Sequence, residues 1–184
     1  MVEIDIQNVV ASGRIADSLD LQALSVAMDR DGVSYMPKRF PGLVYRMREP
    51  KVAVLLFSTC KVVCTGGKSV EQTREAVRRV VKTVATAGAK VRDKVDVEIQ
   101  NIVASADLNI DFDMRLIAMT LLPEGVEYEP EQFPGLVYRL DEPKVVLLLF
   151  GSGKMVCTGA KKPSDVEQAV EKITQELKAA GLLR

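Results

Sequence analysis

The chain has 184 residues, and 47% of them are hydrophobic, so it is long enough to bury the core of one domain or of two closely joined halves. Its 25 lysine and arginine residues balance 25 aspartate and glutamate residues, which argues against an indiscriminate polyanion binder. The lack of histidine excludes Ser-His-Asp, Cys-His and histidine–metal chemistry, and Cys60, Cys64 and Cys157 lack the spacing of a zinc site, so we expect reduced thiols, no metal and no cofactor.

The first half is predicted to contain an alternating strand, a short helix, an antiparallel meander of three strands and a long helix, at residues 2–7, 19–28, 40–48, 52–57, 61–65 and 69–85. Asp17 or Ser18 is expected to cap the short helix, and Ser69 caps the long one. A linker follows up to residue 94, and the second half repeats the order of elements as far as a helix at about 164–180.

The two longest apolar runs, residues 52–57 and 145–150, are too short to cross a bilayer. The N-terminus does not have the pattern of a signal peptide. We therefore expect a cytoplasmic protein with no membrane partner.

The two halves carry the same sequence motifs at a constant offset of 93 positions. Residues 40–46, Phe-Pro-Gly-Leu-Val-Tyr-Arg, return unchanged as residues 133–139, and Cys-Thr-Gly at 64–66 returns at 157–159. A single duplication is too short for a solenoid, so it predicts two half-domains, residues 1–91 and 94–184, related by a pseudo-two-fold axis.

The strand at residues 52–57 is apolar on both of its faces. Successive side chains point to opposite faces of a sheet, so Val54 and Leu56 can pack under the helices while Leu55 and Phe57 face the other way. The charged stripe on the long helix indicates that its outer side is solvated, which leaves one sheet face bare as a binding surface. The alternative is that the two halves pack face to face and bury both surfaces.

The repeated motifs resemble those of the TATA-box-binding protein family in its short archaeal form. They are Gln-Asn-Val/Ile-Val, Phe-Pro-Gly-Leu-Val-Tyr-Arg, Glu-Pro-Lys, Leu-Leu-Phe and Lys-x-Val-Cys-Thr-Gly, present in both halves. The resemblance implies an α+β fold, a pseudo-two-fold duplicated saddle whose curved ten-stranded antiparallel sheet carries four helices on its convex face. This family is itself the reference case of a protein that kinks DNA from the minor groove.

The resemblance also implies roles for individual side chains. Wedge phenylalanines that unstack base steps would be Phe40, Phe57, Phe133 and Phe150. Asn8 and Asn101 would hydrogen-bond the central bases, where a guanine amino group would clash, so A·T pairs should be preferred. The apolar floor would comprise Val10, Val44, Leu55, Val63, Val103, Val137, Leu148 and Val156, and Thr65 and Thr158 would supply hydroxyls beside the central base pairs. Phosphate contacts would come from Arg46, Lys61, Lys68, Arg139, Lys154 and Lys161.

The expected partners are double-stranded TATA-box DNA, transcription factor B and the RNA polymerase pre-initiation complex. By the resemblance, transcription factor B would meet the acidic loop that carries Glu129, Glu131 and Gln132, whereas the equivalent loop of the first half is basic. A homodimer that forms through the apolar face in the absence of DNA is a further expectation. The basic first long helix is either a contact for a regulator or for upstream DNA, or a solvated face.

Two alternatives to a TATA-specific factor remain at the level of sequence. One is a paralogue that bends DNA with little base preference, and the other is a scaffold whose apolar face binds a polypeptide. The turn at Cys60, where the second half has Gly153, leaves the geometry of the first-half turn and the placement of Lys61 open. Residues 67–69, Gly-Lys-Ser, lack the preceding glycine of a P-loop, and no carboxylates cluster beside a nucleophile, so the chain is not expected to be an enzyme.

Overall fold

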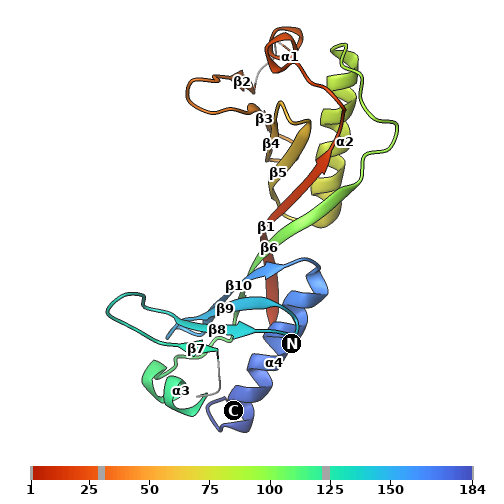
Figure 1. Ribbon diagram of the computed structural model, residues 1–184. Helices are drawn as coiled ribbons and strands as arrows, with labels where there is room; N and C mark the ends of the chain where they lie inside the picture. The colour runs from red at the N-terminus through yellow and green to blue at the C-terminus, as the bar shows by residue number, and fades with distance from the viewer. Residues whose placement is uncertain (1, 29–31, 122–124, 184) are drawn as a thin grey trace. The chain divides into compact units, whose positions relative to one another are not determined.

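The computed structural model describes residues 2–28, 32–121 and 125–183, and over these ranges it contains ten strands and four helices. In chain order they are β1 (Glu3–Arg14), α1 (Leu21–Ala27), β2 (Val33–Tyr35), β3 (Leu43–Met47), β4 (Val52–Leu56), β5 (Lys61–Gly67), α2 (Val70–Thr86), β6 (Val97–Asp107), α3 (Met114–Thr120), β7 (Val126–Glu127), β8 (Leu136–Leu140), β9 (Val145–Leu149), β10 (Lys154–Ala160) and α4 (Pro163–Ala179) (Figure 1).

The chain divides into two compact units. The N-terminal unit is Asn8–Gln100, and the C-terminal unit is Asn101–Arg184 together with Met1–Gln7. The strands of the N-terminal unit follow the order β2-β3-β4-β5-β1, with the first residues of β6 next to β1. Those of the C-terminal unit follow the same order, β7-β8-β9-β10-β6, with the first residues of β1 next to β6.

A glutamine of the repeated Ile-Gln-Asn motif links β1 and β6 in each unit. In the C-terminal unit, Gln7 Nε2 donates a hydrogen bond to Ser105 Oγ at 2.8 Å. In the N-terminal unit, Gln100 Nε2 donates to Ser12 Oγ at 3.0 Å. These two glutamines were not assigned a role from the sequence, although their place in the duplicated motif marked them.

The short helices begin where an aspartate caps them, and not where the sequence pattern suggested. Asp20 Oδ1 accepts a hydrogen bond from the Ala23 N–H at 3.0 Å, so α1 begins at Leu21 and the predicted caps at Asp17 and Ser18 are wrong. Asp17 instead forms an ion pair with Arg92 at 2.6 Å. The hydrogen bond and charge of Arg92 lower the pKa of Asp17.

The long helices agree closely with the prediction. Ser69 Oγ accepts from the Gln72 N–H at 3.0 Å, which confirms Ser69 as the cap of α2. In the C-terminal unit, Asp165 Oδ2 accepts from the N–H groups of Lys161 and Lys162 at 3.2 and 3.1 Å, and α4 begins at Pro163, where proline has no N–H to leave unpaired.

The strands differ from the prediction at their ends. The first strand was predicted to end at residue 7 but continues to Arg14, and the strand predicted at 40–48 begins only at Leu43 because the Phe40 N–H bonds back to the Met36 carbonyl in a turn. The sequence pattern did not locate β2 or β7, which have three and two residues. Strands of that length are too short to show alternation.

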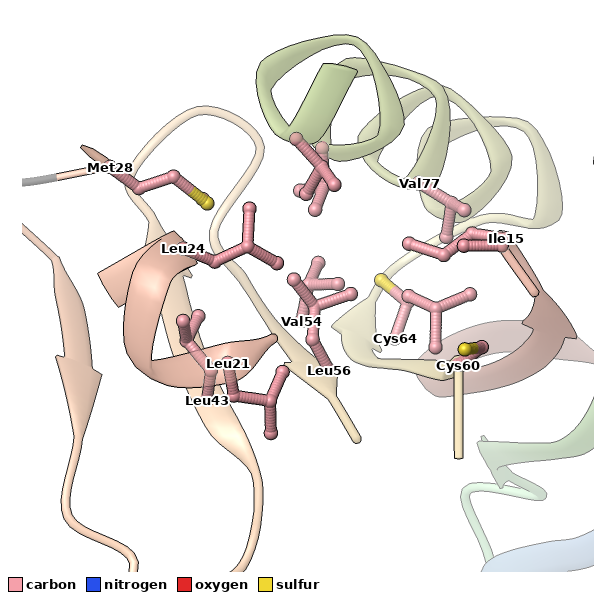
Figure 2. Packing of buried hydrophobic residues seen from close by; sticks show 14 of the residues in the cluster. Ile15, Leu21, Leu24, Met28, Leu43, Val54, Leu56, Cys60, Cys64 and Val77 are labelled. Atoms are coloured by element: carbon pink, nitrogen blue, oxygen red, sulfur yellow. The ribbon is translucent and has the colours of Figure 1, made fainter. Parts of the chain in front are cut away.

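Each unit buries the residues that the alternation assigned to the helix-covered face. In the N-terminal unit, Val54 and Leu56 are fully buried beneath α1 and α2 (Figure 2). The cluster drawn there also includes Ile15, Leu21, Leu24, Met28, Leu43, Cys60, Cys64 and Val77. In the C-terminal unit, Leu147 and Leu149 of β9 and Ile173 and Leu177 of α4 are equally buried.

The three cysteines are buried and free, as predicted. Burial raises the pKa of Cys64 and that of Cys157 to about 11, because a thiolate loses its hydration inside the core.

We expect both thiols to resist alkylation by iodoacetamide at pH 8, where only roughly one in a thousand is ionised, and to react promptly in urea. Peptide mass spectrometry against pH measures this, and rapid native labelling at pH 8 would contradict it. Since the unfolded thiols ionise first, the free energy of unfolding should fall as the pH rises from about 9 to 11.

The turn at Cys60 has the same geometry as its glycine counterpart. Cys60 has φ of +66° and Gly153 has φ of +80°. Each N–H donates to the carbonyl three residues earlier, that of Phe57 and that of Phe150 respectively, at 2.9 Å. Lys61 and Lys154 are therefore held alike, because the Phe57 and Phe150 N–H groups donate to their carbonyls at 3.0 and 2.9 Å. The turn geometry that the sequence left open is therefore the same in both units, while the contact of Lys61 with phosphate stays a prediction.

The path of the preceding loop explains why only one of these turns accepts a side chain. In the C-terminal unit, Asn109 has φ of +55°, and a Cβ built on Gly153 would lie 2.3 Å from the Ile110 carbonyl oxygen. In the N-terminal unit, the equivalent loop instead pairs with the linker, through a bridge between Ala16 and Val91. Cys60 fits there and is 2% exposed.

Candidate nucleic-acid interface

In the N-terminal unit, the sheet face opposite the helices presents a continuous row of apolar side chains. Val44 of β3 pairs with Leu55 of β4, which pairs with Val63 of β5. All three are half-exposed, whereas their neighbours along each strand, such as Leu43, Val54 and Val62, are fully buried. The period of two along each strand thus separates a core face from a second apolar face, which neither α1 nor α2, the helices described in this unit, covers.

The C-terminal unit repeats this row. Val137 of β8, Leu148 of β9 and Val156 of β10 are register partners and are half-exposed. The same alternation holds on the central strands, where Val10 lies half-exposed beside buried Val9 and Ala11, and Val103 beside buried Ile102 and Ala104. All eight residues of the expected apolar floor therefore lie on the face away from the core.

A pair of phenylalanine rings stands beside each row, and one ring of each pair, Phe57 or Phe150, follows Leu55 or Leu148 by two positions along the chain. The Phe40 and Phe57 centroids are 5.9 Å apart with an interplanar angle of 66°, and Phe133 and Phe150 have the same distance and angle. Phe40 is 38% exposed and Phe133 is 37% exposed, which is unusual for side chains of this size. Edge-to-face contact holds each pair without burying it.

A glycine beneath each ring pair makes this arrangement possible. A Cβ built on Gly42 would lie 2.7 Å from Phe40 Cε1 and 3.1 Å from Phe57 Cε1, and one on Gly135 would lie 2.7 and 3.0 Å from the matching atoms of Phe133 and Phe150. The two glycines were not predicted as site residues. Their constant place in the repeated Phe-Pro-Gly motif was the available signal.

The side-chain oxygen of each of the two asparagines is held by a backbone N–H group of the neighbouring strand. Asn8 Oδ1 accepts from the Gly66 N–H, and Asn101 Oδ1 accepts from the Gly159 N–H, both at 2.7 Å. Because the carbonyl oxygen of each amide is engaged, its Nδ2 is the atom left to act on a ligand, as a donor. Asn8 also lies 3.4 Å from Thr65 Oγ1, so the predicted hydroxyl is beside it.

Both units carry exposed cations around the apolar rows. Arg46 and Thr65 both pair with Ala53, so they share one row across β3, β4 and β5, and Arg139, Val146 and Thr158 repeat that row. Thr158 is half-exposed, as is Thr65. Arg139 also contacts Glu127 at 3.4 Å. The predicted phosphate-contact residues are all exposed: Arg46, Lys61, Lys68, Arg139, Lys154 and Lys161.

The loop before the second ring pair exposes the three residues assigned to a protein partner. Glu129, Glu131 and Gln132 are exposed, and the Gln132 and Phe133 N–H groups both donate to the Glu129 carbonyl at 2.9 Å. The same turn therefore positions the acidic side chains and the exposed ring of Phe133.

Within the described ranges, no group of three or more His, Cys, Asp or Glu side chains is placed to hold a metal ion. Among the helices of those ranges, none has the length and apolar character needed to cross a membrane.

Comparison with known proteins identifies the family. The family model described as transcription factor TFIID, or TATA-binding protein, matches residues 3–87 and again 96–180. The TATA-box-binding protein of Archaeoglobus fulgidus is 55% identical over 181 residues, covering 98% of both chains. TATA-box-binding protein E of Halobacterium salinarum is 54% identical over 180 residues, covering 98% of this chain and 96% of the relative.

A solved structure agrees with these sequence relatives. The Methanococcus jannaschii TBP matches with a TM-score of 0.82 and 49% identity over 96% of this chain and 99% of its own. The fold class predicted from the resemblance, with ten antiparallel strands and four helices, is confirmed. This chain belongs to the TATA-box-binding protein family, whose members are transcription factors and not enzymes.

Proposed function

We propose that this protein is a general transcription initiation factor that binds the TATA box in the minor groove and bends it. The observation that carries the proposal is the half-exposed apolar row of each unit, with a phenylalanine pair beside it in which one ring is exposed and the other half-exposed. A largely apolar sheet face suits the minor groove, where sugars line the walls, and an edge-to-face ring pair suits insertion between base pairs.

The polar groups of the interface support a preference for A·T pairs. The amide nitrogens of Asn8 and Asn101 act as donors, and A·T pairs offer only acceptors in the minor groove. A guanine adds an amino donor, which would oppose an amide donor. The apolar rows distinguish bases poorly, so further selectivity would come from how readily a T·A-rich sequence bends.

The exposed cations of the interface supply the remaining affinity in this proposal. Arg46, Lys61 and Lys68, with their counterparts in the C-terminal unit, contact phosphates along the edges of the site. These contacts release counterions, so affinity should fall steeply as salt is added.

The acidic loop at Glu129 and Glu131 is the proposed contact for transcription factor B, which in turn recruits RNA polymerase. The equivalent loop of the N-terminal unit carries exposed Lys38 and Arg39. This difference in charge gives a partner a basis for choosing one end of a nearly symmetric protein, which would orient the complex on the promoter. The protein would act at the nucleoid in the cytoplasm of an archaeal cell.

The proposal is tested by titrating the protein into a duplex with a T·A-rich octamer and into a G·C-rich control at controlled salt. Fluorophores on the two duplex ends report the distance between them. We expect tight binding and a marked fall in end-to-end distance with the first duplex only. Equal bending of both would support the paralogue without base preference. No binding would leave either a strict requirement for transcription factor B or the polypeptide scaffold, and repeating the titration with transcription factor B added separates these two.

The orientation of the amide makes a sharper prediction for Asn101. Asn101→Asp keeps the oxygen that accepts from the Gly159 N–H but replaces the donor by a carboxylate, which base acceptors repel. We expect affinity for the T·A-rich duplex to fall by at least about tenfold, consistent with about 1–3 kcal/mol per base contact. Asn101→Ala should weaken binding less. Both variants should keep the thermal transition, because Gly159 is exposed and water can replace the lost partner. A variant that no longer melts cooperatively would make Asn101 structural instead.

A further inference from the structure

The N-terminal unit has a hollow of about 810 Å³ between the end of β3 and the outer side of α2. It lies away from the apolar row, and its size is that of a small-molecule site. Figure 1 shows how α2 runs alongside the strands of this unit. The lining residues that carry charge are Arg46, Arg48, Glu49, Arg79 and Lys82.

Positive charge dominates this hollow, with four cations against the single carboxylate of Glu49 among the lining side chains. Arg79 is held in place, because its Nη1 donates to the Glu49 carbonyl at 2.9 Å and its Nε lies 3.4 Å from Glu75 Oε1. The hydroxyls of Thr83 and Thr86 donate to carbonyls one helical turn earlier, at 3.0 and 2.9 Å. Recognition of a ligand would therefore depend on the cations.

A second hollow of about 540 Å³ continues the first. It shares Arg48, Glu49 and Arg79 with it and adds Lys51 and Glu75 to the charged lining, so five cations face two carboxylates over the two hollows. Together the two hollows form a single basic groove, defined by Arg46, Arg48, Lys51, Arg79 and Lys82.

The equivalent surface of the C-terminal unit has no excess of positive charge, although Arg139, Lys144 and Lys172 stand there in place of Arg46, Lys51 and Arg79. The positions of Arg48, Lys82 and Thr83 are occupied there by Asp141, Gln175 and Glu176. The Tyr138 hydroxyl donates to both Glu176 carboxylate oxygens, at 2.9 and 2.7 Å, and burial together with this carboxylate raises the pKa of Tyr138 well above its usual value. Since both units have the same fold, the fold itself does not require a basic groove.

We propose that the basic groove binds an oligophosphate, either free or as the phosphate chain of a nucleotide. An oligophosphate concentrates several negative charges within one small volume, as these cations do, and guanidinium groups pair with phosphate oxygens through two parallel hydrogen bonds. Carboxylates of a polypeptide are spaced along an extended chain and match a compact groove less well. This site is separate from the proposed DNA interface except at Arg46, and it goes beyond the proposed function.

Isothermal titration calorimetry of the full chain with sodium tripolyphosphate, and separately with ATP, tests the proposal at fixed ionic strength. We expect one-to-one binding, and in the double variant Arg79→Gln with Lys82→Gln a Kd higher by at least about tenfold. Lys172→Gln with Lys178→Gln removes the same charge from α4 and should change Kd by less than about twofold. If circular dichroism shows that the first variant is unfolded, Arg48→Gln with Lys82→Gln replaces it.

The outcomes separate the possible ligands. Similar affinity for tripolyphosphate and ATP assigns the site to the phosphate chain alone, and tighter ATP binding assigns it to a nucleotide. Three results would overturn the proposal. They are no binding of tripolyphosphate up to about 1 mM, an equal loss of tripolyphosphate affinity in the α2 and α4 double variants, and tighter binding of an oligoglutamate peptide than of tripolyphosphate. DNA bending is measured on the same samples and should not change in either double variant, so failure of this site and failure of the proposed function are distinguishable.

Discussion

Replacement of Phe57 and Phe150 by alanine should abolish bending of the T·A-rich duplex while leaving the protein folded. Each ring belongs to a different unit and is half-exposed, so its loss removes one edge-to-face contact, of about 0.5–1.5 kcal/mol, and no part of the buried core. Unstacking a base step costs a few kcal/mol and requires an inserted side chain. Without the inserted rings, no contact compensates for unstacking the base step, so the bent complex is not stabilised. We therefore expect the affinity for the T·A-rich duplex to fall by at least about a hundredfold.

The control for this pair is Phe112→Ala. Phe112 is the fifth phenylalanine of the chain and belongs to neither ring pair, and its N–H donates to the Gly151 carbonyl at 2.7 Å. At a temperature where all variants are folded by circular dichroism, Phe112→Ala should bend DNA as the parent does. Undiminished bending by the double variant, measured by end-to-end fluorescence transfer, would show that the rings are not the wedges.

Gly153→Cys should destabilise the protein much more than the reverse change, Cys60→Gly. At position 153 the new Cβ would meet the Ile110 carbonyl oxygen at 2.3 Å, and the residue must also keep a φ of +80°. Backbone strain together with this clash predicts a loss of at least about 2 kcal/mol in the free energy of unfolding. Cys60→Gly relieves the strain of a non-glycine residue at positive φ, but it also removes a buried side chain. Because the two effects oppose each other, we expect the free energy of unfolding to change by no more than about 1 kcal/mol.

Urea unfolding followed by circular dichroism measures both variants against the parent protein. The two variants exchange glycine and cysteine in opposite directions at equivalent turns, so each serves as the control for the other. Equal stabilities of Gly153→Cys and the parent would mean that the loop at Ile110 moves aside easily, and that the linker bridge at Ala16 does not explain the difference between the turns.

Local patterns in the sequence were enough to determine which face of each long strand is buried. Leu55 and Phe57 alternate with Val54 and Leu56, and a strand places successive side chains on opposite faces whatever surrounds it. The duplication likewise determined that both units have the same order of elements, because each motif recurs without a gap. The family, and through it the ten-stranded fold, followed from motifs that occur twice.

Contacts between distant residues decided what the patterns could not. The helix α1 begins after Asp20 while Asp17 pairs with Arg92, 75 residues away, a choice that local propensity does not encode. The short strands β2 and β7 exist because β3 and β8 offer them an edge to pair with.

The finer features of the candidate sites also depend on the tertiary structure. The outward amide of Asn8 depends on the Gly66 N–H, the exposed ring pairs depend on the space above Gly42 and Gly135, and the basic groove appears where β3 approaches α2. Sequence alone determined which residues lie on the face away from the core, since alternation is a property of one strand. Only the tertiary structure decided how those residues are held, since hydrogen bonds and close packing join segments that are far apart in the chain.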